Sequence, residues 1–237
     1  MFGLFAVSSV ERAVHMQEYN PPPPEEVDRL LQDLIKYVAV DYSADILVKV
    51  ALLYYQFETI HPFNSGNGRA GRLLPVVLLM KKKILSKGCL FISEYFYKYN
   101  YVCLDLYKSV QHFGNYTEWI KFFLQCIIDS SNRAIKQFEE AVNERNRAEK
   151  KLQHGTKFTR ELSEIYNFLE KKPVFMIKNL VDTFHMSYHT AASRVDILIK
   201  MSVVKQHKEQ HRNRMFIMQA YFDVFADDIA RSGISSN

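Results

Sequence analysis

The stretch His61–Arg72, which reads HPFNSGNGRAGR, joins two segments with helical periodicity. Its Gly66 and Gly68 can adopt positive φ, so successive backbone N–H groups can converge on one point and form an anion-binding nest. The helix that follows adds unsatisfied N–H donors and the positive end of its dipole. Arg69 and Arg72 lie three residues apart, and therefore on one face close to that helix start. Two guanidinium groups beside an N–H nest suit a polyphosphate.

His61 ends the helix before this loop and supplies a candidate general base. An imidazole titrates near neutral pH and can remove a proton from an incoming hydroxyl. Each feature alone has an ordinary explanation, because Gly-Asn-Gly is usually a turn and paired arginines usually form a solvated face. Their combination within one short stretch favours phosphoryl or nucleotidyl transfer. Phe63 is interpreted as a core anchor for the loop.

Segments on both sides of the loop have the periodicity of helices. The proline run Pro21–Pro24 is followed by Glu25 and Glu26, acidic residues that suit the first turn of a helix. Apolar residues then recur at three- and four-residue steps. The helices expected in this part of the chain cover residues 27–40, 44–60, 69–82, a segment beginning near Ile92, and 117–152.

The sequence changes character after His154-Gly155-Thr156, which is the expected domain boundary. Three short amphipathic segments, 161–169, 177–184 and 188–201, precede two expected strands at 203–207 and 215–218. Three helices followed by a hairpin is the order of a winged-helix domain. In that interpretation Tyr188–Met201 is the recognition helix and the basic turn Lys205–Arg214 is the wing.

Composition limits the classes of protein that the chain can represent. Of its 237 residues 48% are hydrophobic, which allows a buried core without disulfides. The three cysteines lack metal-ligand spacing, so buried thiols and a cytoplasmic location are expected. We expect neither a signal peptide nor a membrane-spanning helix. The net charge of +5 permits an anionic partner without requiring one.

The stretch 61–72 closely resembles the motif of the Fic/Doc (Fido) family, His-Pro-Phe-x-(Asp/Glu)-Gly-Asn-Gly-Arg-x-x-Arg. Further similarity lies in Tyr19–Val27, Tyr55–Ile60, Ser93–Phe96 and Glu118-Trp119, so that the resemblance covers roughly residues 3–150. It implies a mainly helical Fic core with a small hairpin flap near Leu4–Tyr19, which would align a target segment by strand-like pairing.

The resemblance also implies an activity, the transfer of AMP from ATP to a Ser, Thr or Tyr hydroxyl of a target protein. His61 would be the catalytic base, and Arg72 would face the terminal phosphate. ATP would be the substrate and Mg²⁺ the accompanying ion. The residues that would bind ATP and its phosphates are Ser65, Gly66, Asn67, Gly68, Arg69 and Arg72.

The sequence departs from the family pattern in three respects. Ser65 replaces the acidic residue that holds Mg²⁺, and a neutral hydroxyl is a weaker ligand for a hard cation, so metal placement would be looser. Cys103-Leu104 stands where many relatives carry a Tyr-Tyr pair near the nucleotide. No (Ser/Thr)-x-x-x-Glu-(Gly/Asn) string occurs beside the core to restrain Arg72. An unrestrained Arg72, a separate inhibitory partner and an upstream segment are all open explanations.

These observations lead to two functional hypotheses. The first is a protein adenylyltransferase whose activity Ser65 weakens. The alternative is a catalytically impaired Fic scaffold that acts as a nucleotide-binding or DNA-binding regulator, and for the winged helix both DNA binding and protein docking are open. The expected domains are a flap region at 1–20, a Fic helical core at 21–153, a winged helix at 157–225 and a tail at 226–237.

Overall fold

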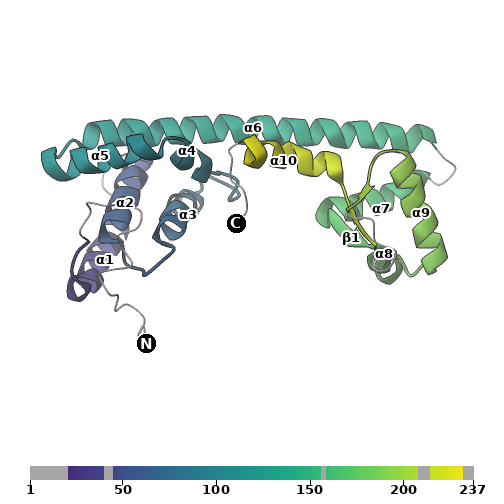
Figure 1. Cartoon of the computed structure of the whole chain (residues 1–237), viewed down its shortest axis with the longest axis horizontal. Helices are drawn as coiled ribbons and strands as arrows, with labels where there is room; N and C mark the ends of the chain where they lie inside the picture. The colour runs from purple at the N-terminus through teal and green to yellow at the C-terminus, as the bar shows by residue number, and fades with distance from the viewer. Residues whose placement is uncertain (1–20, 40–44, 156–158, 208–213, 232–237) are drawn as a thin grey trace. The chain divides into compact units, whose positions relative to one another are not determined.

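The computed structural model describes residues 21–39, 45–155, 159–207 and 214–231. It divides into two compact units, Met1–Ala134 and Ile135–Asn237 (Figure 1). The flap hairpin expected within residues 1–20 lies outside the described residues, as does the tip of the expected wing at 208–213. The expectation of a mainly helical chain is confirmed.

The regular elements in the described part of the first unit are all helices, and most expected helix positions are correct to within a few residues. One expected helix near Ile92 is in fact two, separated at Tyr99. The helices are α1 (Pro24–Ala39), α2 (Ile46–Ile60), α3 (Asn67–Lys81), α4 (Ser93–Lys98), α5 (Asn100–Phe113) and the start of α6 (Tyr116–Gly155).

Helix α2 lies at the centre of this unit and packs against both α1 and α3. Its N-cap residue is Asp45, whose carboxylate accepts a hydrogen bond from the Leu47 N–H at 2.7 Å and so satisfies one unpaired donor of the first turn. Most of its residues are buried on all sides. Because it ends at Ile60, the packing of α2 fixes the position of His61.

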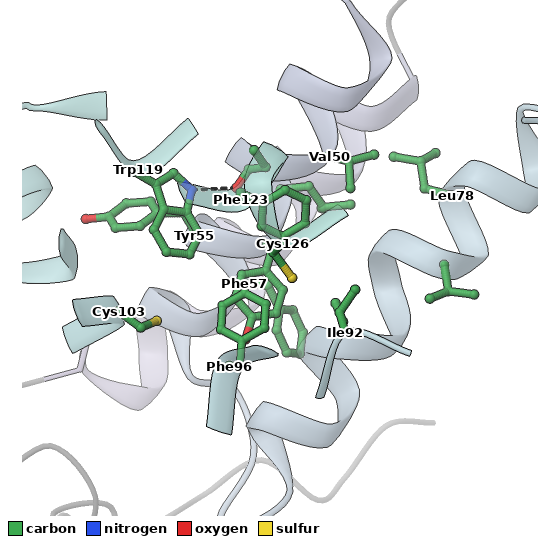
Figure 2. Close-up of a cluster of buried hydrophobic side chains, with 14 of the residues drawn as sticks. Val50, Tyr55, Phe57, Leu78, Ile92, Phe96, Cys103, Trp119, Phe123 and Cys126 are labelled. Atoms are coloured by element: carbon green, nitrogen blue, oxygen red, sulfur yellow. Dashed lines mark hydrogen bonds between the residues drawn. The ribbon is translucent and has the colours of Figure 1, made fainter. Parts of the chain in front are cut away.

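Trp119 of α6 anchors the core around α2 (Figure 2). Its side chain is fully buried, and its Nε1–H donates to the Ala51 carbonyl oxygen at 2.8 Å. The indole ring stacks on Tyr107 with a centroid distance of 4.9 Å. Cys103 and Cys126 lie in the same core as free thiols, whereas Cys89 is only half-buried. The expectation of buried thiols is therefore confirmed for two of the three cysteines.

The second unit has its own hydrophobic core and a small antiparallel sheet with strand order β1-β3-β2. Phe175 and Phe216 pair across β1 and β3, with their rings stacked 5.6 Å apart. Besides the end of α6, the elements are α7 (Thr159–Lys171), β1 (Val174–Met176), α8 (Ile177–Phe184), α9 (Tyr188–Lys200), β2 (Lys205–Gln206), β3 (Met215–Ile217) and α10 (Gln219–Arg231).

The sequence did not predict β1 or α10. Strand β1 has three residues, too few for an alternating pattern to stand out, and it becomes a strand because β3 pairs with it.

In the part of the chain that the structure describes, we find no helix long and apolar enough to cross a membrane.

Candidate functional site

The loop between α2 and α3 begins at His61, which takes a left-handed conformation with φ 51° and ψ 56°. Its backbone N–H donates to the Phe57 carbonyl oxygen at 3.1 Å and closes the helix. The ring Nδ1 lies 3.3 Å from the Glu58 carbonyl oxygen. A carbonyl oxygen only accepts, so this contact requires a proton on Nδ1, and the lone pair of the neutral ring is then on Nε2. That tautomer suits a general base.

Asn67 closes the loop with two side-chain hydrogen bonds to one residue. Its Oδ1 accepts from the Phe63 N–H at 2.8 Å, and its Nδ2 donates to the Phe63 carbonyl oxygen at 2.6 Å. Asn67 is 2% exposed, so these bonds are shielded from water. The side chain of Asn67 thus shapes the loop, and its contribution to an anion site would come from the backbone N–H. Phe63 packs against the core, with its ring 6.2 Å from that of Phe57, as expected for an anchor.

The N-cap residue of α3 is Gly66, whose φ of 85° is in the left-handed region that favours glycine. The first N–H groups of a helix have no intrahelical acceptor, and Gly66 has no side chain that could cap them. These donors and the helix dipole make the start of α3 suitable for an anion.

Both motif arginines fold back over the glycines of this first turn. A Cβ added to Gly66 would lie 3.4 Å from Arg69 Nη2, and one added to Gly68 would lie 2.9 Å from Arg72 Nη1. The two guanidinium groups therefore lie beside the helix start, where the sequence predicted a polyphosphate site. The absence of a side chain at Gly68 leaves the space that Arg72 occupies.

Ser93 and Glu58 also belong to this site, although no role was predicted for either residue. Ser93, the first residue of α4, accepts a hydrogen bond on Oγ from Arg72 Nε at 3.0 Å. Among the described residues Arg72 forms no ion pair with a carboxylate. The hydrogen-bond partner that orients the Arg72 guanidinium group is thus a neutral hydroxyl group.

Glu58 lies on α2 directly against α3 and is 7% exposed. A Cβ added to Gly71 would overlap its Oε1 and would lie 3.0 Å from its Cδ, so Gly71 gives this carboxyl its space. Oε1 is buried without a hydrogen-bond partner. Burial raises the pKa of Glu58 to about 7, and the charge of Arg72 opposes part of that rise.

The pKa of Glu58 predicts how the stability of the first unit depends on pH. The folded state holds the carboxyl proton up to about pH 7, whereas the ordinary pKa of a glutamate carboxyl is 4.5. The folded state therefore binds more protons between these values, and stability falls as pH rises through this window. Relative to Glu58→Gln, the free energy of unfolding of the parent should fall by about 2 kcal/mol from pH 5 to pH 8.

Urea denaturation followed by the fluorescence of Trp119, the single tryptophan, measures this difference in the unit that contains Glu58. Subtracting the Glu58→Gln profile removes the titrations that both proteins share. Parallel pH profiles would contradict the assignment.

Ser65 and its neighbour Asn64 are exposed in the loop. Within residues 21–39, 45–155, 159–207 and 214–231, no three His, Cys, Asp or Glu side chains gather as metal ligands. The described residues therefore do not offer Mg²⁺ the carboxylate ligand that the acidic motif residue would supply.

The sequence of this loop and its flanking helices is similar to those of known proteins. Residues 3–79 match the model of the Fic/DOC family. A probable protein adenylyltransferase of Aquifex aeolicus is 33% identical over 69 residues, which are 29% of this chain and 22% of that protein. A protein adenylyltransferase of Drosophila willistoni is 36% identical over 70 residues, 29% of this chain and 14% of that protein. Over these residues the chain is therefore similar to proteins of the Fic/DOC family.

These similarities cover only a minor part of each relative. The chain aligns with 22% of the Aquifex protein and with 14% of a protein adenylyltransferase of Caenorhabditis elegans, to which it is 30% identical. The crystal structure of a Fic family protein from Desulfovibrio desulfuricans superposes with a TM-score of 0.46 and 17% identity. That superposition covers 84% of this chain and 56% of the other.

Proposed function

We propose that the chain is a protein adenylyltransferase, which moves AMP from ATP to a Ser, Thr or Tyr hydroxyl of a target protein. The observation that carries the proposal is the placement of Arg69 and Arg72 over the first turn of α3, at the end of the loop that begins with His61. The names of the curated relatives support the same reaction.

Each group of the site has a role in this reaction. His61 Nε2 accepts the proton of the target hydroxyl, and the hydroxyl oxygen forms a bond to the α-phosphorus. The bond from that phosphorus to the bridging oxygen breaks, and pyrophosphate leaves with the electron pair. Arg69, Arg72 and the N–H groups of α3 compensate the charge of the phosphates, with Arg72 toward the terminal one.

Mg²⁺ is the expected companion of ATP, and in this chain its ligands would be phosphate oxygens rather than a motif carboxylate. Ser65 offers a neutral hydroxyl at that position. The metal would therefore be held less firmly, which limits the rate of transfer. ATP labelled at the α-phosphate, offered with a cell lysate as acceptor, tests the proposal by transfer of label to protein.

Restoring the carboxylate should increase that transfer. Ser65→Asp is expected to raise labelling about tenfold at limiting Mg²⁺, because an anionic ligand binds the cation more firmly. Ser65→Asn is the matched control, since it has a similar size without the charge. Equal labelling by the parent, the aspartate and the asparagine variants would show that this position does not limit the reaction.

For the second unit, the winged-helix assignment is part of the proposal. The order α7, β1, α8, α9, β2, β3 and the sheet order β1-β3-β2 support it. Arg194 of the expected recognition helix pairs with Glu161 of α7 at 2.9 Å and is largely buried. Helix α9 therefore offers DNA less positive charge than its sequence suggests, and DNA binding stays a prediction beside protein docking. The cysteines, none of which forms a disulfide, support the cytoplasmic location that we propose.

A further inference from the structure

Glu58 is a buried carboxyl group that the proposed reaction does not use. It lies one helical turn before His61, and its own backbone carbonyl oxygen is the group that Nδ1 of His61 contacts. Burial of a carboxyl oxygen without a hydrogen-bond partner is costly, and such a group in a native protein calls for a physical explanation.

The space around Glu58 comes from the motif itself. Gly71 presents only its Cα toward the carboxyl, and any side chain at that position would collide with Oε1. The next residue along α3 is Arg72, whose guanidinium group is directed back toward Gly68. The close approach of α2 and α3 thus places the buried Glu58 carboxyl group against Gly71, the residue that precedes Arg72.

The charged and titratable groups that influence Glu58 come from three helices. Arg72 of α3 favours the carboxylate, while Tyr54 of α2 and Cys103 and Tyr107 of α5 share its buried surroundings. Burial raises the pKa of the Cys103 thiol to about 12, and it raises the pKa values of both tyrosines well above 10. These three groups are therefore neutral at physiological pH, and Glu58 is the member of the cluster that titrates there.

From this geometry we infer that Glu58 is a positioning residue for Arg72, and that an anion bound at Arg72 is coupled to uptake of a proton by Glu58. The inference rests on the proposed function, because it concerns the same polyphosphate site. Without ligand, the charge of the Arg72 guanidinium group, which lies beside Gly68, favours the ionised form of Glu58. A bound terminal phosphate offsets the charge of Arg72, so the buried carboxylate loses its stabilising cation and takes a proton from solvent. By linkage, protonation of Glu58 then favours phosphate binding.

Calorimetric titration with α,β-methylene-ATP, which cannot transfer AMP, measures this proton directly. At pH 7.5 the parent should take up about half a proton more than Glu58→Gln, obtained from the dependence of the binding enthalpy on buffer ionisation enthalpy. Protonation of the ligand in solution is common to both titrations and cancels. Glu94→Gln, which changes a partly buried carboxylate paired with Arg133 in the same unit, should behave as the parent.

A second measurement needs no ligand. Removing the charge in Arg72→Met should raise the midpoint of the Glu58 titration by about half a pH unit or more, since its stabilising cation is lost. The midpoint is obtained from the pH dependence of unfolding, relative to the same protein with Glu58→Gln. An unchanged midpoint, or equal proton uptake by the parent and Glu58→Gln, would overturn the inference.

The inference and the proposed function fail in different ways. Normal proton uptake without any transfer of label would contradict the adenylyltransferase and leave the role of Glu58 supported. Transfer of label together with unchanged proton uptake in Glu58→Gln would support the adenylyltransferase and contradict the role of Glu58. A parent that binds no nucleotide would contradict both the function and the coupling to phosphate.

Discussion

Replacing His61 by alanine is expected to reduce transfer of the labelled AMP to protein by about 10²–10⁴-fold, the usual contribution of a general base. The physical reason is the contact of Nδ1 with the Glu58 carbonyl oxygen, which leaves Nε2 as the basic nitrogen of the neutral ring. Alanine retains the backbone hydrogen bond to Phe57 that ends α2, but its side chain has no group that can accept a proton. Initial rates of labelling at saturating ATP measure the effect.

Binding of ATP provides the control for this prediction. The phosphates are assigned to the start of α3, so His61→Ala should bind α,β-methylene-ATP within about threefold of the parent. His112→Ala, which removes an exposed histidine of α5 in the same unit, should label like the parent. Unchanged labelling by His61→Ala would exclude His61 as the base.

The largest expected effect on stability is that of Gly71→Ala. The added methyl group would overlap Glu58 Oε1 and would lie 3.3 Å from the Phe57 ring, both fixed in the α2–α3 contact. Relief requires α2 and α3 to separate or the carboxyl to leave its site, so we expect a loss of about 3 kcal/mol or more. Urea denaturation monitored by Trp119 fluorescence gives the value.

A second substitution identifies the cause of that loss. Glu58→Ala removes the atoms with which the methyl group collides, so Gly71→Ala should cost much less in the Glu58→Ala background than in the parent. Gly88→Ala is the matched control, because its methyl group would meet Met80 Sδ at an ordinary 3.6 Å, and it should change stability by less than about 0.5 kcal/mol. Equal costs of Gly71→Ala in both backgrounds would contradict the proposed collision.

The parts of the fold that the sequence predicted correctly are those determined locally. Periodicity located α1, α2 and α3, and Gly66 indicated the turn before α3 because positive φ favours glycine. The extent of α3 was also correct, although Pro75 lies inside it. The proline removes one hydrogen bond from a helix that packing against α2 holds in place.

The parts that the sequence did not predict depend on contacts between distant segments. Ser93 belongs to the site because α4 places its hydroxyl beside Arg72, 21 residues away. Glu58 looks like an ordinary polar residue of α2 until α3 covers it. The signal that could have revealed it is an acidic residue in a mostly apolar helix, with a glycine on the facing helix. Helix α10 was missed because the helical periodicity of its apolar residues is weaker than that of α8.

The closed loop around Asn67 has a consequence for the chemical lifetime of the protein. An asparagine followed by glycine is prone to deamidation, because the next backbone nitrogen can attack the side-chain amide when the chain is free to bend. In this protein both atoms of the Asn67 amide are bonded to Phe63, and Gly68 already belongs to a helix. Conversion to aspartate would also set a carboxylate oxygen against the Phe63 carbonyl oxygen, two acceptors without a proton between them. The folded loop thus disfavours deamidation at Asn67, and unfolding removes this protection.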